Sequence, residues 1–268
     1  IFLKTVPKKV VSFLKNTRER FMSRKIVITS GKGGVGKTTV AANLGARLGA
    51  AGKRVCVVDL DMGLNNLDVV TGVENLVVYD LVDCLEGRCR AKQAIVECPS
   101  AKNAFVLPCV RSPSGGKISA DALKELYEGL DGVFDFIITD CPAGVGEGFR
   151  LAVGASDEAV VVTTPQLTSL RDADKVLSIL RGAKLSSVKM VINRVRGDLV
   201  AGGAMLSPEE IEKTLRAPLL GVVPDDDGVF LNNAGLIPPE AASYRAFKLL
   251  ANNLLSGKRK IYDCTSKY

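Results

Sequence analysis

Residues 31–39 read GKGGVGKTT, between a β-branched run at 25–30 and a helical pattern at 38–51. The string matches G-x-x-x-x-G-K-[ST] in a strand–loop–helix setting, where glycines let the backbone turn sharply and approach phosphates closely. The following helix presents free N–H groups and the positive end of its dipole. The string therefore predicts an α/β fold that binds a nucleotide triphosphate together with Mg²⁺.

The side chains of this loop have separate predicted tasks. Lys37 can reach the β- and γ-phosphates, and the Thr38 hydroxyl can ligate Mg²⁺. An ordinary phosphate loop needs no second lysine near its start, so Lys32 is unusual. The predicted nucleotide-binding residues of the loop are Gly33, Gly34, Val35, Gly36, Lys37, Thr38 and Thr39.

The rest of the chain alternates apolar strand-like runs with helical patterns. Continuous apolar runs are typical of strands buried on both faces of a parallel sheet. Strands are expected at 25–30, 54–59, 104–107, 134–140, 159–163, 188–193 and 219–224, and helices at 38–51, 121–130, 170–181, 208–215 and 240–255. This alternation, without a Pro/Gly/Ser-rich linker, predicts one doubly wound, mostly parallel sheet with helices on both faces.

Three carboxylates lie at the ends of predicted strands. Asp59 and Asp61 are alternate residues and therefore face the same way, and Asp140 closes the strand FDFIIT. Ligand sites of open α/β sheets lie outside the carboxyl ends of the strands. Carboxylates gathered there suit Mg²⁺, its waters and an attacking water. The loop at 142–144 can move with the γ-phosphate.

The composition excludes several kinds of catalysis. The chain has no histidine, which removes Ser-His-Asp and Cys-His catalysis and histidine-bound zinc. It has seven cysteines without a C-x-x-C spacing, which is typical of reduced thiols in a cytosolic protein. Most of them are expected to be small buried hydrophobic residues.

The basic excess of the chain belongs to one end of it. Residues 1–25 carry eight basic side chains and one acidic, and the other 243 carry 28 of each. The net charge of +7 therefore does not indicate a nucleic-acid-binding body. We expect a basic extension outside the fold at 1–22, one phosphate-loop ATPase domain at 23–256 and a basic tail at 257–268.

The N-terminal extension has two interpretations. Charges interrupt it so that no more than five uncharged residues follow one another, and it therefore lacks the continuous apolar region of a secretory signal. The chain begins without Met, and Met22 stands just before the first predicted strand, which favours a segment extraneous to the domain. The alternative is a basic amphipathic helix with Val6, Val10 and Phe13 on one face. The chain has no run of 18 apolar residues, so no transmembrane helix is expected.

The phosphate loop with its second lysine resembles the deviant phosphate loop of the MinD/ParA group of ATPases. Longer strings look like the MinD family, whose members position bacterial division. They are TSGKGGVGKTT at 29–39, VDLDMGLNNLD at 58–68, VVYDLVDCLEG at 77–87, ITDCPAG at 138–144, SLRDADKVL at 169–177 and LLGVVPDD at 219–226. The resemblance covers about residues 23–255.

This resemblance implies catalytic roles for Lys32, Lys37 and Asp61. In the family, the second lysine, here Lys32, reaches across a nucleotide-sandwich homodimer to the partner's phosphates. Asp61 would orient or activate the attacking water. Asp59 and Asp140 would hold Mg²⁺ through water, beside the Thr38 hydroxyl.

The resemblance also implies contacts to the base and to other proteins. Adenine of ATP would be contacted by Asn193, Pro224 and Asp225. Partner proteins would be a MinC-like division inhibitor and a topological regulator, MinE-like or linked to DivIVA. The residues implied for these partners are Asn65 and Asn66, in the first switch region, and Arg171, Asp172 and Asp174, on the helix at 170–181.

Family members end in a short amphipathic helix that binds anionic membrane. The present chain stops at GKRKIYDCTSKY, which is basic but lacks the apolar stripe. We therefore expect membrane attachment to need a C-terminal helix that is not present here. The resemblance implies a cytoplasmic protein, peripheral at the inner face of the cell membrane.

Three other functions share this phosphate loop. A MinD-like ATPase for flagellar placement is the nearest alternative. A ParA-type DNA-partition ATPase needs a basic surface, and the zero net charge of residues 26–268 argues against it, so no nucleic acid is expected. A redox ATPase like the nitrogenase iron protein needs paired cysteines for a cluster, and Cys141 has no partner at a suitable spacing.

Overall fold

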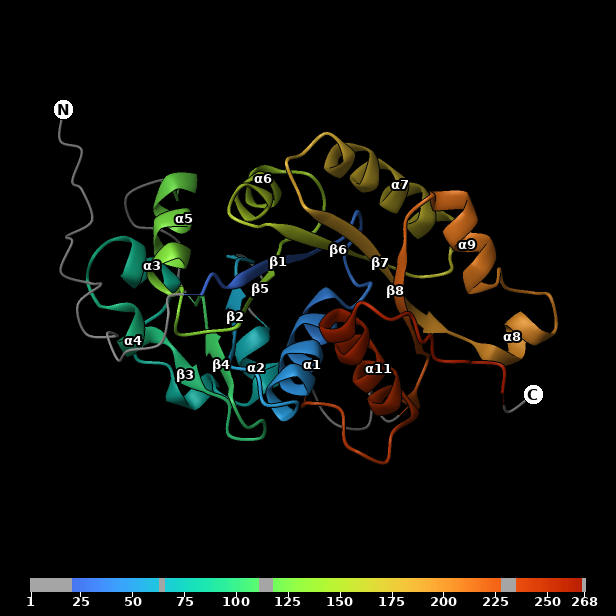
Figure 1. The fold of residues 1–268 in the computed structure, drawn as a ribbon, viewed down its shortest axis with the longest axis horizontal. Coiled ribbons are helices and arrows are strands. Elements are labelled where there is room, and N and C mark those ends of the chain that lie inside the picture. The colour runs from blue at the N-terminus through green and yellow to red at the C-terminus, as the bar shows by residue number, and fades with distance from the viewer. Residues whose placement is uncertain (1–20, 63–65, 111–117, 228–234, 267–268) are drawn as a thin grey trace.

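The computed structural model describes residues 21–62, 66–110, 118–227 and 235–266. Within them the strands form one sheet in the order β3-β4-β2-β5-β1-β6-β7-β8 (Figure 1). All neighbours are parallel except β3 and β4. The strands are β1 (Arg24–Thr29), β2 (Val55–Asp59), β3 (Val96–Glu97), β4 (Ala104–Leu107), β5 (Phe136–Asp140), β6 (Glu158–Thr163), β7 (Ser187–Val195) and β8 (Leu219–Pro224).

Helices cover both faces of this sheet. In Figure 1, α1 (Lys37–Ala50) and α11 (Ala242–Ser256) lie below the sheet, whereas α5 (Ala120–Gly129), α6 (Glu147–Gly154), α7 (Leu167–Arg181) and α9 (Pro208–Leu215) lie above it. The shorter helices are α2 (Leu67–Thr71), η2 (Glu74–Leu76), α3 (Leu81–Leu85), α4 (Ala91–Ala94) and α8 (Gly197–Ala201). The predicted doubly wound α/β fold is confirmed.

The core forms two layers because alternate strand residues face opposite ways. On β1, Ile26 and Ile28 join the cluster with α1 and α11, and Val27 joins the cluster on the other face. On β2, Val57 and Val58 divide between the clusters in the same way. Strands buried on both faces read as continuous apolar runs, which is why the sequence revealed them.

The segment after α11 crosses the edge of the sheet at β8. Asn253 donates to the carbonyls of Leu220 and Lys260, at 2.9 and 3.0 Å, and accepts from the Lys260 amide. Ile261 packs against one core layer and Tyr262 against the other. Part of the predicted tail at 257–268 is therefore held on the fold. No helix in the described ranges is long and apolar enough to span a membrane.

Candidate functional site

The phosphate loop lies between β1 and α1, near the centre of the sheet. From β1 the chain continues to β2 on one side of β1, and from β5 it crosses to β6 on the other side. Gly34 and Gly36 have φ of 76° and 96°, backbone angles that glycine adopts without strain. Gly36 is the N-cap of α1, and this helix has no side-chain cap and no acidic residue in its first turn. The N–H groups and positive dipole end of α1 are therefore available to an anion.

Two glycines let neighbouring elements pack directly on this loop. A Cβ at Gly31 would stand 2.3 Å from the backbone carbonyl oxygen of Asp172 in α7. A Cβ at Gly36 would stand 2.3 Å from Nδ2 of Asn193, which donates to the Val35 carbonyl at 2.8 Å. The loop is thus fixed from one side by α7 and from another by the end of β7.

Behind the loop lie the predicted Mg²⁺ ligands. Asp59 and Asp140 are register partners at the ends of β2 and β5, and both are buried. The Thr38 side chain hydrogen-bonds to Asp140, and Lys37 is buried close enough to act on that carboxyl. The Oδ1 atom of Asp140 is buried and has no hydrogen-bond partner. A carboxylate oxygen left open beside a hydroxyl suits a hard cation such as Mg²⁺.

Burial opposes negative charge at this place. Burial, together with the charge of the neighbouring Asp140, raises the pKa of Asp59 to about 8, although the hydrogen bond from the Asp61 amide lowers it. Burial also raises the pKa of Asp140 to about 7, against the hydrogen bond from Thr38 and the charge of Lys37, which lower it. Two such carboxyls side by side favour a bound cation, because it relieves both the desolvation and their mutual repulsion.

Asp61 and Lys32 lie at the outer side of the loop and strand ends. Asp61 is half-buried, and its amide donates to Oδ1 of Asp59 at 2.9 Å. Lys32 is exposed, and its ammonium lies 3.3 Å from the hydroxyl of Thr168, at the start of α7. The second lysine is therefore held at the surface of the site, away from the buried position of Lys37.

A pocket of about 320 Å³ lies beside the phosphate loop. Lys32, Gly33, Gly34 and Val35 line one side, and Asp225, after β8, lines another. Its other walls come from the segment that follows β6 and from the end of β7 and the segment after it: Thr164, Pro165, Gln166, Ser169, Arg194, Arg196 and Met205. The pocket can take a base and ribose whose phosphates rest on the loop.

The predicted base contacts occupy different places around this pocket. Asp225 lines it, and the Asp225 amide donates to the Val195 carbonyl at 2.9 Å. Asn193 is buried behind the loop, and Pro224 ends β8. Their contact with adenine stays a prediction. The sequence analysis missed Arg194, Arg196 and Met205 as pocket residues. Arg194 and Arg196 follow the predicted strand at 188–193, and this place could have indicated them.

The predicted partner-binding residues lie on α7 and α2. Arg171 and Asp174 are exposed, whereas Asp172 is half-buried and pairs with Lys175 at 3.3 Å. Asn66 is exposed at the start of α2, and Asn65 lies outside the described residues. The backbone of Asp172, which lies between the exposed Arg171 and Asp174 in the sequence, packs on Gly31 of the phosphate loop.

Comparisons with known proteins agree with this geometry. Residues 26–236 match the family model of the CobQ/CobB/MinD/ParA nucleotide binding domain. The septum site-determining protein MinD of Bacillus subtilis is 41% identical over 240 residues, which cover 87% of this chain and 90% of that protein.

Two solved structures share the fold at similar sequence identity. One is from a MinC:MinD cell division protein complex of Aquifex aeolicus, with a TM-score of 0.81, 36% identity and coverage of 89% of this chain and 97% of that chain. The other is the septum site-determining protein MinD of Pyrococcus horikoshii complexed with Mg-ADP, with a TM-score of 0.76, 34% identity and coverage of 90% and 100%. This chain therefore belongs to the MinD family of septum site-determining ATPases.

Proposed function

We propose that this protein is a Mg²⁺-dependent ATPase switch that dimerises on ATP and positions the division site by recruiting a division inhibitor to the membrane. The observation that carries the proposal is the cradle itself. An uncapped helix N-terminus follows the glycine loop, and the half-buried Thr38 hydrogen-bonds to the buried Asp140, which has an open carboxylate oxygen. Such a cradle suits a nucleotide phosphate and a hard cation.

The residues of the site divide the work of hydrolysis. Thr38, Asp59 and Asp140 would hold Mg²⁺, which when bound offsets the charge of the β- and γ-phosphates. Lys37 binds the same phosphates from its buried position. Asp61 orients the attacking water, since its backbone is tied to Asp59 and its side chain is less buried.

The position of Lys32 suits contact with the nucleotide of a second subunit. Its ammonium lies at the exposed face of the loop, beside Thr168, so it does not occupy the inner position that Lys37 takes. Two ATP molecules that face each other across a dimer axis repel strongly in a dry interface. A lysine from each side offsets that repulsion only when both subunits hold ATP. ATP then favours the dimer, and hydrolysis releases it.

The surface for the division inhibitor is proposed on α7. The relative from Aquifex aeolicus is found in a complex with MinC. In this chain, Arg171 and Asp174 present exposed charge on α7. The backbone of α7 touches the phosphate loop at Gly31. A conformational change of the phosphate loop on hydrolysis would therefore be transmitted to this surface through that contact. A topological regulator, MinE-like or linked to DivIVA, would use the same face together with Asn65 and Asn66.

The proposed location is the inner face of the membrane. Two weak amphipathic anchors, one from each subunit of a dimer, bind a membrane that a single anchor does not hold. Dimerisation and membrane attachment are therefore coupled. A C-terminal amphipathic helix would supply such an anchor. In this organisation residues 1–22 are a basic extension outside the fold, 23–256 form the ATPase domain, and 257–268 are a basic tail.

Nucleotide binding tests the proposal directly. Calorimetry should show ATP binding that is tight with Mg²⁺ and weakened by chelation, with GTP binding at least tenfold more weakly. Asp121→Ala, an exposed change in the first turn of α5, is a matched control and should bind as the wild type does. Equal binding of ATP and GTP would refute the base assignment, and Mg²⁺-independent binding would refute the metal site. Salt-sensitive retention of DNA would favour the DNA-partition alternative instead.

A further inference from the structure

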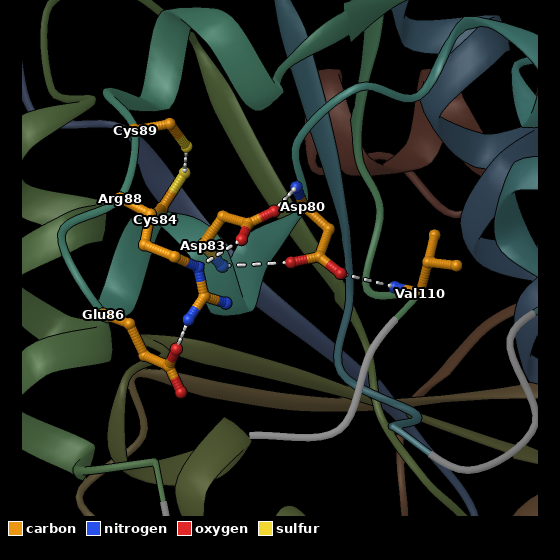
Figure 2. A network of polar contacts seen from close by, with 7 residues as sticks. All are labelled: Asp80, Asp83, Cys84, Glu86, Arg88, Cys89 and Val110. Atoms are coloured by element: carbon orange, nitrogen blue, oxygen red, sulfur yellow. Dashed lines mark hydrogen bonds and ion pairs between the residues drawn. The ribbon is translucent and has the colours of Figure 1, made fainter. Parts of the chain in front are cut away.

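Two cysteines on the opposite side of the sheet from α1 lie in contact. Cys84 lies in the last turn of α3, and Cys89 lies just after the turn that follows this helix. The two Sγ atoms are 3.4 Å apart (Figure 2). Both are free thiols. The proposed ATPase site uses neither residue, so this dithiol needs a separate account.

The turn that brings the two thiols together is fixed by hydrogen bonds. Asp80 and Asp83 form a capping box at the start of α3, and Gly87, with φ of 75°, reverses the chain after it. The amides of Arg88 and Cys89 both donate to the Asp83 carbonyl, at 2.8 and 3.4 Å. The proximity of the sulfurs is therefore a property of the backbone as well as of the side-chain rotamers.

Charged side chains brace the same turn. The Arg88 Nε donates to Oδ1 of Asp83 at 2.6 Å, and its guanidinium also pairs with Glu86 (Figure 2). Asp80 accepts from the Val110 amide at 3.1 Å, which ties the start of α3 to the segment after β4. The two thiols thus sit on a turn that is anchored at both ends.

The two thiols differ in access. Cys84 is buried and Cys89 is half-buried, so a reagent reaches Cys89 first. Burial raises the pKa of both thiols. At Cys89, the charges of Asp83 and Asp80 add to that rise, whereas the hydrogen bond from Cys84 and the charge of Arg88 oppose it. Because Cys89 is the more accessible thiol, it is the one that attacks first, and the buried Cys84 reacts second.

We propose that Cys84 and Cys89 form a redox modification site, which closes to an intramolecular disulfide by exchange with a low-molecular-weight disulfide. The Cys89 thiolate attacks one sulfur of that disulfide, forms a mixed disulfide and releases one small thiol. The Cys84 sulfur then attacks Sγ of Cys89 and releases the second small thiol. The protein dithiol loses two electrons and two protons, and both pass to the two small thiols.

Trypsin provides a sharp assay for this disulfide. Cleavage after Arg54, Arg88 and Arg90 places Cys84 in peptide 55–88 and Cys89 in peptide 89–90. The folded protein is incubated with oxidised glutathione at mildly alkaline pH, its remaining thiols are alkylated, and the digest is read by mass spectrometry. We expect the two peptides to be linked, to separate on reduction, and to give fragments that place the link at Cys84 and not at the fully buried Cys56.

Single substitutions separate the two steps. Cys84→Ser should leave a stable glutathione adduct on Cys89, because the second attack is lost. Cys89→Ser should leave Cys84 unmodified, because Cys84 is buried. Cys264→Ser removes a half-buried cysteine elsewhere and should leave the link unchanged. The adduct at Cys89 should rise from a trace in the wild type to nearly all of the protein in Cys84→Ser.

Two results would overturn the proposal. One is a glutathione adduct that persists on Cys89 in the wild type without a link to Cys84. The other is a folded protein in which neither cysteine reacts under conditions that oxidise a synthetic peptide of residues 80–90. A circular-dichroism spectrum and a two-state unfolding curve for each variant would establish that it folds, so that misfolding cannot imitate either result.

Discussion

Among single residues, the burial of each carboxyl group determines whether it suits a cation or a water molecule. Asp59 and Asp140 lie at the ends of adjacent strands, where burial raises the pKa of each. Asp61 follows on the same strand end but is only half-buried. The more buried pair is suited to a cation, and the more accessible carboxylate is suited to a water molecule, which must enter and leave.

Asp61→Ala should therefore separate binding from hydrolysis. The variant should bind ATP and dimerise as the wild type does, because the phosphate loop is untouched. Its turnover should fall by roughly 10²–10⁴-fold, the usual loss for a positioned acid or base. Steady-state phosphate release measures this, with Asp121→Ala as the control carboxylate. Wild-type turnover in Asp61→Ala would move the role to Asp59 or to water alone.

The sequence predicted the phosphate loop residue by residue, because a glycine-and-lysine pattern at fixed spacing serves one kind of backbone conformation. It did not predict the pocket residues Arg194 and Arg196. The β7–β8 pairing shifts register between Ile192 and Val195, and Arg194 has φ of 58°. The place of these arginines after the predicted strand at 188–193 could have indicated that they are near the site. An apolar run carries no sign of such an irregularity, so the direction of their side chains could not be predicted.

Between elements, the phosphate loop packs closely against the backbone of α7 at Gly31. Gly31→Ala would place a methyl group 2.3 Å from the carbonyl oxygen of Asp172, which belongs to a helix and cannot turn aside. Overpacking of this kind costs about 1–3 kcal/mol. We expect that loss in chemical unfolding without nucleotide, together with weaker ATP binding.

Gly33→Ala is the matched control for that substitution. The added methyl group at Gly33 meets nothing within 4 Å. Its effect on the free energy of unfolding should be within about 0.5 kcal/mol, as for ordinary surface changes. Equal stability of the Gly31 and Gly33 variants would show that the loop and α7 are not tightly packed on each other.

The segment after α11 depends on one side chain. Asn253→Ala would remove two donated hydrogen bonds and one accepted bond, and would leave the buried Leu220 carbonyl without this donor. The expected loss is about 1–3 kcal/mol, with faster tryptic cleavage at Lys258, Arg259 and Lys260. Asn252→Ala, an exposed neighbour on the same helix, should change neither measurement. Unchanged cleavage in Asn253→Ala would contradict this anchoring.

Long and buried helices and strands were predicted from the sequence, and the short helices were not. The long central strands were predicted because both faces are buried. The start of α9 is marked by Ser207 and Glu210, which form its observed capping box, and by Pro208 in its first turn, a pattern that indicates a helix start. The short helices α2, α3, α4 and α8 have four or five residues each, too few to show a helical period. The eight-residue α6 was missed because glycines surround and enter it. The two-residue β3 has no pattern of its own.

In the whole molecule, the functional parts gather at the carboxyl ends of the central strands. The phosphate loop, the buried carboxyls, the pocket and the start of α7 all lie there. Lys32 is exposed at this end and points its charge toward Thr168, next to the exposed side chain of Leu167. This face therefore offers a charged residue and an apolar residue to a second copy of the chain.

ATP-dependent dimerisation is the central claim, and size-exclusion chromatography with light scattering tests it most directly. With Mg²⁺ and a non-hydrolysable ATP analogue, the wild type should run as a dimer, and with ADP as a monomer. Lys32→Ala should still bind the analogue, measured by calorimetry, but stay a monomer, because the charge that offsets the facing phosphates is gone. A Lys32→Ala protein that dimerised as fully as the wild type would contradict the account.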